Sequence, residues 1–174
     1  MRKRQQGLFI VEFAIIAVAL FIVVFTVLEL ARIVWIWNTA DEATRRGARV
    51  AAVCPINHPA VAEATVFAPA GGGPNSPILR GLSATDNVTV TYLDENGAED
   101  TDFTDIRYVR VSLRNYTVTP LIPFIDVTFT LPPFETTIPS ESLGLVPDPD
   151  NPDDPPVCSC FGSTGPTVDC LYTG

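Results

Sequence analysis

The apolar residues of this chain gather in one long run close to its beginning. Residues 8–28 contain a single charged residue, Glu12, and neither glycine nor proline. A helix of about 20 apolar residues is long enough to cross the hydrocarbon core of a bilayer. A secretory signal has a shorter apolar segment of about 7–15 residues and then a cleavage site of small residues. The pattern therefore predicts a membrane-spanning helix over residues 8–28.

The pattern after this run is that of an amphipathic helix. Apolar and small residues recur at steps of three and four as far as the Cys-Pro pair at 54–55. Because the residue before proline avoids helical dihedral angles, we expect one continuous helix over residues 8–53, about 68 Å long. The small residues would let a sheet approach closely, and we favour packing within the protein over contact with another subunit. The small-residue stripe comprises Ala40, Ala43, Gly47 and Ala51. The recurring positions of the whole amphipathic face are Ile33, Trp37, Ala40, Ala43, Gly47, Val50 and Cys54.

Three later segments alternate between apolar and polar residues, which is the period of a strand with one buried face. They are residues 88–93, 106–119 and 125–131, and a turn-forming sequence at 94–97 follows the first. The apolar faces of such strands need cover, and the nearest cover is the small-residue stripe of the helix. The predicted fold class is α+β, with a long N-terminal helix and a small antiparallel β-sheet domain packed on its outer half.

The other segments are loop-like in composition. Residues 55–87 contain the Pro- and Gly-rich stretch 68–77, and no Gly-Lys-Ser/Thr follows it, so the sequence does not indicate a phosphate-binding loop. The predicted organisation is a leader (1–7), the long helix (8–28 transmembrane, 29–53 amphipathic and extracytoplasmic), a β-rich extracytoplasmic domain (54–146), and an acidic Pro-rich spacer with a Cys-containing tail (147–174).

Charge predicts the orientation of the chain in the membrane. Arg2, Lys3 and Arg4 precede the apolar run, and basic flanks stay on the cytoplasmic side. We therefore expect a single-pass protein of the inner (cytoplasmic) membrane, with its N-terminus inside and its C-terminal domain periplasmic or extracellular. From residue 54 onward there are 16 Asp and Glu against four Arg, a formal balance of −12. Such a surface repels nucleic acid and anionic lipid headgroups.

Few residues suggest catalysis or metal binding. The one histidine, His58, lies four residues after Cys54. A Cys–His pair can act as a nucleophile, but outside the cytoplasm a disulfide-bonded Cys54 is the better interpretation. A zinc site built from these two residues with Cys158 and Cys160 is disfavoured by its C-x-C spacing. We predict no enzymatic activity and no cofactor.

The acidic spacer offers a second set of metal ligands. Its carboxylates could gather a calcium ion, but the segment lacks the turn glycine and the bidentate glutamate of known calcium loops. We therefore interpret it as a solvated spacer. The carboxylates belong to Asp148, Asp150, Asp153 and Asp154.

Two glutamates mark the inner and outer parts of the apolar run. A carboxylate in hydrocarbon costs at least about 2.5 kcal/mol, which makes Glu12 a candidate functional residue; the alternative is a side chain that reaches water at the membrane edge. Glu29 lies at the outer interface with Arg32 one turn later. We expect it to be solvated and structural.

The four cysteines allow three pairings. A bond between Cys158 and Cys160 would close a very small, strained ring. Two arrangements remain: Cys54–Cys158 with Cys160–Cys170, or Cys54–Cys160 with Cys158–Cys170. Either of them folds the spacer back and ties the tail to the outer end of the long helix.

The residues around Gly7 carry a resemblance to a known signal. Arg-Gln-Gln-Gly followed by Leu-Phe-Ile-Val-Glu-Phe resembles the class III signal of type IV pilins and pseudopilins. Glu-Leu-Ala-Arg at 29–32 and the run at 38–53 resemble the TadE-like pseudopilins of the tight-adherence (Tad/Flp) pilus system. The resemblance covers residues 1–53. The span lacks the proline that many such sequences carry.

This resemblance implies a pilin-like fold and a structural role, as a minor pilin or pseudopilin in priming or at the tip of the pilus. A prepilin peptidase would cut between Gly7 and Leu8, and Glu12 would neutralise the freed amine of Leu8 in a neighbouring subunit. The implied partners are other pilin subunits, the peptidase, the inner-membrane assembly platform and the membrane. The alternative is an uncleaved, single-pass anchor that displays a binding or sensory domain.

Overall fold

A computed structural model describes residues 6–69, 71–121, 128–146, 157–158 and 160 of the 174-residue chain. Three helices come first in the sequence and seven short strands follow. In chain order the elements are α1 (Gln6–Ala51), α2 (Pro59–Thr65), α3 (Ala84–Asn87), β1 (Val88–Leu93), β2 (Tyr108–Leu113), β3 (Thr117–Val118), β4 (Phe129–Thr130), β5 (Phe134–Pro139), β6 (Leu145–Val146) and β7 (Val157–Cys158).

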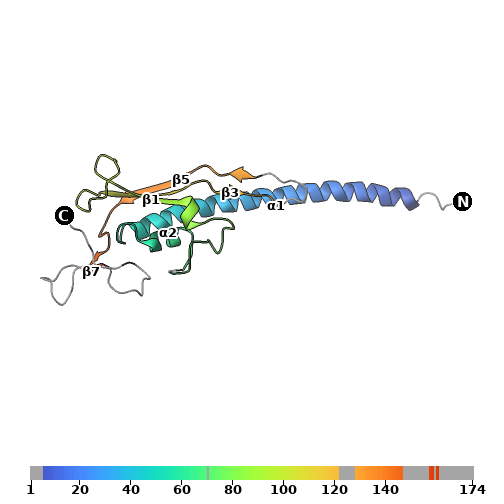
Figure 1. The fold of residues 1–174 in the computed structure, drawn as a ribbon. Coiled ribbons are helices and arrows are strands. Elements are labelled where there is room, and N and C mark those ends of the chain that lie inside the picture. Colours follow the sequence, from blue (N-terminus) through green and yellow to red (C-terminus); the bar gives the residue numbers. More distant parts are fainter. Residues whose placement is uncertain (1–5, 70, 122–127, 147–156, 159, 161–174) are drawn as a thin grey trace.

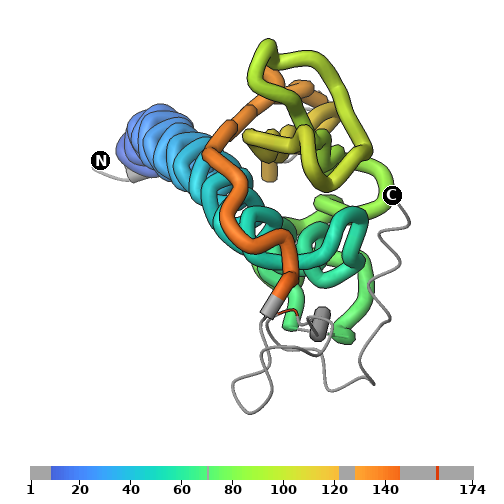
Figure 2. The backbone as a smooth tube through the Cα atoms, turned by 90° about the vertical axis from the view of Figure 1, so that its left-hand side faces the viewer, coloured from blue at the N-terminus to red at the C-terminus, as the bar shows by residue number. Residues whose placement is uncertain are grey.

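The long helix of the prediction is present as one element of 46 residues. It begins at Gln6 and ends at Ala51, so it starts and stops two residues before the predicted bounds. Its first half projects alone, and its second half runs along the other elements, which we call the head (Figure 1). Figure 2 shows the later segments gathered around the outer end of the helix. The predicted α+β class is confirmed.

The main sheet has three antiparallel strands in the order β1-β2-β5. Val111 at its centre pairs with Val90 on one side and Thr136 on the other. Val109, Val111 and Leu113 have no exposed surface, as the alternation in the sequence predicts. Their buried face packs on α1 in two hydrophobic clusters, one with Leu113 and the other with Val109 and Val111, and both include residues of the helix.

The third strand of this sheet is not the predicted one. Residues 134–139 form it as β5. The predicted segment 125–131 is described from residue 128 onward, and there Phe129 and Thr130 form β4, which pairs with β3. The predicted segment 106–119 is also divided, because Asn115 has a φ of +55° and ends β2 before β3 begins. β5 lies at the edge of the sheet, where Pro139 is tolerated.

The segment predicted as loop, residues 55–87, contains two short helices. The side chain of His58 caps α2, since its Nδ1 accepts the Ala60 N–H at 3.2 Å, and Pro59 occupies the first turn, where its missing N–H costs nothing. Ser83 caps α3 by accepting from the Thr85 N–H. Capping residues in a Pro- and Gly-rich segment started helices that the hydrophobic pattern did not indicate.

Close approach of α1 to its neighbours depends on the small-residue stripe. Ala40, Ala43 and Ala51 are fully buried, and Gly47 is buried beside α2 and β2. The amphipathic face differs from the prediction at one turn, where Ile36 faces the core and Trp37 is 45% exposed, with its ring edge-to-face on Phe134. The stripe packs inside the protein, as expected.

The end of α1 is tied to the last described part of the chain. The N–H groups of Glu141 and Leu143 both donate to the carbonyl of Ala52, just past the helix. β6 then pairs with β7, in a register that places Leu145 opposite Cys158. The spacer between these strands, with its four aspartates, lies outside the described residues. The segments on either side of it are therefore held at the outer end of α1.

Gly47 provides a test of this packing. A Cβ at position 47 would overlap Thr65 Oγ1 and would lie 3.0 Å from Thr65 Cβ and 3.2 Å from Val111 Cγ1. We expect Gly47→Ala to lower the free energy of unfolding, because overpacking costs about 1–3 kcal/mol and outweighs a gain of about 1 kcal/mol in helix propensity. Denaturant unfolding of the full chain in detergent measures the change.

Two variants serve as controls for this experiment. Arg49→Ala lies on the exposed side of the same helical turn and should leave the unfolding midpoint almost unchanged. Adding Thr65→Ala to Gly47→Ala should recover part of the loss, since contacting residues are energetically coupled. A Gly47→Ala chain as stable as the original would contradict the packing described here.

Candidate functional site

The first part of α1 presents an apolar surface that no other described residue of the chain covers. Between Phe9 and Leu30 the large apolar side chains are 42–74% exposed. Among the described residues, one helix, Phe9–Ala51, is long and apolar enough to contain a membrane span. Exposed apolar surface of this extent marks contact with lipid or with other protein chains. The helix is suited to serve as a membrane anchor.

The residues of the predicted processing and assembly site lie at the start of this helix. The Gly7–Leu8 bond belongs to the first turns of α1, and Glu12 follows Gly7 by five residues, about 7.5 Å along the axis. Glu12 is exposed among apolar neighbours and makes no ion pair with any residue that the structure describes. The helix thus presents one carboxylate on an otherwise apolar surface near its N-terminus.

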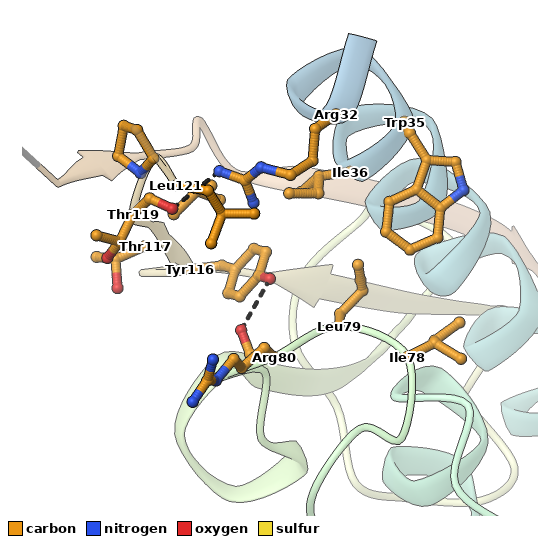
Figure 3. A pocket seen from close by; sticks show the side chains of 13 residues that line it. Arg32, Trp35, Ile36, Ile78, Leu79, Arg80, Tyr116, Thr117, Thr119 and Leu121 are labelled. Carbon is orange, nitrogen blue, oxygen red and sulfur yellow. Dashed lines mark hydrogen bonds between the residues drawn. The ribbon is translucent and has the colours of Figure 1, made fainter. Parts of the chain in front are cut away.

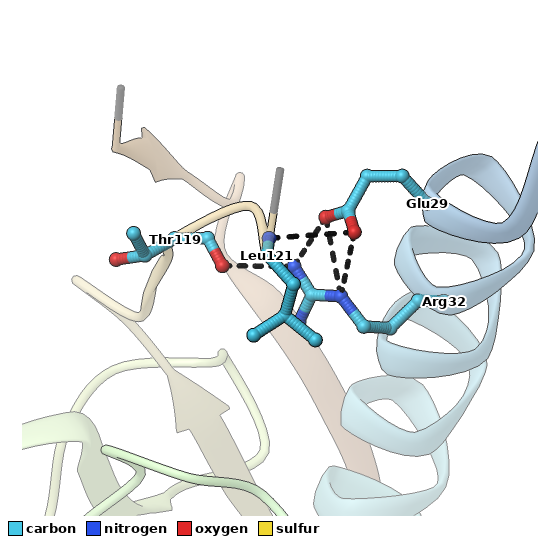
Figure 4. A network of polar contacts seen from close by, with 4 residues as sticks. All are labelled: Glu29, Arg32, Thr119 and Leu121. Atoms are coloured by element: carbon cyan, nitrogen blue, oxygen red, sulfur yellow. Dashed lines mark hydrogen bonds and ion pairs between the residues drawn. The ribbon is translucent and has the colours of Figure 1, made fainter. Parts of the chain in front are cut away.

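A second carboxylate, Glu29, lies where the head begins, and Figure 4 shows its contacts. Arg32 Nε donates to both oxygens of Glu29, at 3.1 and 3.2 Å, and Arg32 Nη2 also forms an ion pair with this carboxylate. Arg32 Nη2 donates as well to the Thr119 carbonyl at 2.8 Å, and the Leu121 N–H lies 3.4 Å from Glu29 Oε2. This pair binds the segment after β3 to the helix.

The expectation that Glu29 is solvated is wrong. Glu29 is only 9% exposed, because residues 119–121 cover it. The Glu–Arg spacing was visible in the sequence, whereas the backbone partners are about 90 residues away and left no signal. A buried carboxylate is stable only when it is paired, and here Arg32 provides the pair.

Two cavities flank α1 next to this ion pair. The larger, of about 570 Å³, lies between Arg32, Trp35, Tyr116 and the loop at 78–81 (Figure 3). The Tyr116 hydroxyl donates to the Arg80 carbonyl at 3.1 Å, and burial raises the pKa of this hydroxyl while the charge of Arg32 opposes the rise. The smaller cavity, of about 240 Å³, is apolar and lies beside Trp37 and Phe129. No carboxylate, cysteine or histidine is among the described residues that line either cavity.

The cysteine and histidine candidates take structural places. Cys54 is bonded to Cys160, with Cα atoms 4.7 Å apart, which is one of the two bonds that the sequence left open for Cys54. His58 accepts a hydrogen bond as the cap of α2, so neither residue is placed as a nucleophile or a zinc ligand. Cys158 pairs through its backbone with Leu145, and Cys170 lies outside the described residues. In the described part of the chain no three His, Cys, Asp or Glu side chains gather as metal ligands.

The sequence of α1 is similar to that of a known protein family. Residues 7–49 match the family of TadE-like proteins. The match confirms the resemblance seen in the sequence. No curated protein and no solved structure is significantly similar to this chain.

The TadE-like segment coincides with α1 almost from end to end. It includes Glu12, the Glu29–Arg32 pair and the small-residue stripe, and it stops two residues before the helix does. The head and its disulfide lie outside it. The match relates this helix to TadE-like proteins of the Tad pilus.

The disulfide outside the TadE-like segment generates a prediction. Cys54 and Cys160 are 106 residues apart in the chain, and closing a loop of about 100 residues is worth about 4–5 kcal/mol in the chain-entropy model. We expect Cys54→Ser combined with Cys160→Ser to lower cellular accumulation of the protein more strongly than Cys170→Ser. Immunoblots against a co-expressed standard protein measure the difference.

Non-reducing peptide mapping provides the matched chemical control. A peptide that links Cys54 to Cys160 should be present in the mature protein and should disappear on reduction. Recovery of Cys54 as a free thiol, or equal loss for Cys170→Ser, would contradict this role of the bond.

Proposed function

We propose that this protein is a minor pilin or pseudopilin that takes part in assembly of a Tad-type pilus, either in priming or at the tip. One observation carries the proposal: the TadE-like match coincides with a helix whose apolar surface is exposed and bears the lone carboxylate Glu12. A helix of this kind suits both storage in a bilayer and packing against other helices. The head, on the outer half of α1, leaves that surface free.

Cleavage after Gly7 would change the balance of charge at the membrane. Arg2, Lys3 and Arg4 hold the uncleaved N-terminus in the cytoplasm. Their removal leaves one positive group on that end of the helix, the amine of Leu8. When the subunit is extracted from the bilayer into a filament, one positive charge instead of several must pass through the hydrocarbon core. Each charge in hydrocarbon is costly in free energy.

Glu12 supplies the partner for that amine. An ammonium and a carboxylate that meet within an apolar bundle offset part of the desolvation cost of each. Since each helix carries one of each group, four residues or about 6 Å apart along the axis, pairing between neighbouring subunits would set their axial register. Glu12 in this role is an assembly residue, and Gly7 with Leu8 forms the processing site.

The mature N-terminus tests this function. In cells with an active prepilin peptidase, mass spectrometry should find a protein that begins at Leu8, and Gly7→Val should retain Met1 because the branched side chain blocks cleavage. Gly7→Ala serves as the conservative control. Met1 still attached to the original protein in such cells would overturn the pilin proposal in favour of the uncleaved anchor.

A second experiment concerns Glu12 alone. We expect Glu12→Gln to insert into the membrane normally and to be cleaved, but to be lost from sheared pili, because the neutral amide removes the partner of the Leu8 amine. Glu42→Gln, on the exposed polar side of the same helix, is the control and should assemble normally. Wild-type amounts of Glu12→Gln protein in sheared pili would rule out the pairing role.

A further inference from the structure

The exposed apolar side chains of the head gather at one end. Beyond residue 34, six large apolar side chains in the described part of the chain are at least 40% exposed. One of them, Tyr108, begins β2 beside the loop farthest from the exposed helix. We call the other five the collar: Trp35, Trp37, Ile78, Leu121 and Phe129.

The collar surrounds the point where α1 enters the head. Trp35, Ile78 and Leu121 line the larger of the two cavities, and Trp37 and Phe129 line the smaller. Both cavities are walled by Ile36, Val118 and Pro120, so the two groups adjoin each other around the helix. In Figure 1 the β3–β4 end of the head is the one from which the bare helix emerges. The collar therefore continues the apolar surface of the anchor.

The Glu29–Arg32 pair fixes the depth of the collar. Glu29 directly follows the predicted span, and its carboxylate lies 3.4 Å from the Leu121 N–H. Leu121 is nevertheless 73% exposed. Trp35 lies six residues beyond Glu29, about 9 Å by helical rise, and helical side chains lean toward the N-terminus, which is the membrane side here. The headgroup layer is about 5–7 Å thick on each side of the core. Both side chains reach this layer.

The charged residues of the head are distributed unevenly between the collar and the opposite end. The larger cavity within the collar is lined by Arg32 and Arg80, and no acid is among the described residues that line either cavity. Six acids instead occupy the loop between β1 and β2, which Figure 1 shows at the opposite end of the head. Anionic phospholipid headgroups attract basic residues near the surface and repel acidic ones. The six are Asp94, Glu95, Glu99, Asp100, Asp102 and Asp105.

We propose that the collar docks the head onto the phospholipid surface, with its aromatic and aliphatic side chains in the headgroup and glycerol layer of the leaflet where α1 emerges. Tryptophan favours this layer because its ring is apolar and its N–H is polar. The helix brings the collar to this depth within one chain, so the contact forms before any partner arrives. The inference goes beyond the proposed function and holds whether or not the N-terminus is cleaved.

Site-specific fluorescence in vesicles tests the docking. The chain has two tryptophans, both in the collar, so Trp35→Phe with Trp37→Phe gives a background without tryptophan. Leu121→Trp in this background places one probe on the collar, and Tyr108→Trp places a matched probe at the far end. The full chain is reconstituted in phosphatidylethanolamine–phosphatidylglycerol vesicles, with and without lipid brominated near the top of its acyl chains.

We expect the probe at 121 to lose most of its emission to brominated lipid and to be shielded from iodide, and the probe at 108 to show the reverse. Equal behaviour of the two probes would overturn the proposal. The proposal would also be overturned if neither brominated lipid nor iodide quenched the probe at 121 and this protection increased with the protein-to-lipid ratio. A second copy of the chain would then cover the collar. Far-UV circular dichroism and the Cys54–Cys160 peptide verify that each variant is folded.

Discussion

Close contact between α1 and the head is the constraint on which the rest of the structure depends. The helix can serve as part of the core because alanines and one glycine face the sheet and α2, which brings the backbones of three elements near each other. At Gly47 there is no room for a side chain, since an added Cβ would meet both Thr65 and Val111. Larger residues there would push α2 and β2 apart, and the buried valines of β2 would lose their cover.

The same helix therefore meets two environments along its length. Its first part exposes bulky apolar residues that match lipid or other helices, and its second part buries small ones against its own chain. The Glu29–Arg32 pair lies at the change between the two. A buried ion pair adds little net stability, but breaking it is costly, so it specifies where residues 119–121 meet the helix.

Periodicity was a reliable guide where one physical effect dominated. The anchor helix, β1 and β2 follow directly from runs of one period. The strand β5 was missed because Phe-Glu-Thr-Thr-Ile-Pro lies between prolines at an edge of the sheet, where few apolar residues are needed. The helix α2 depends on a histidine cap and a proline, which resemble loop residues in composition. The sequence could not show whether Cys54 bonds to Cys158 or to Cys160, because these two cysteines are only two residues apart. The fold of the chain after β5 places Cys160 next to Cys54.

The disulfide also determines how the head bears mechanical load. A pull along α1 reaches Cys54 just past the end of the helix and passes through a covalent bond to Cys160. The sheet and α2 lie inside the loop that this bond closes, so tension between the anchor and the chain beyond residue 160 bypasses them. If the helix is pulled while the tail is held, the protein would extend by little. The residues between Cys54 and Cys160 cannot be pulled out straight until the bond is reduced.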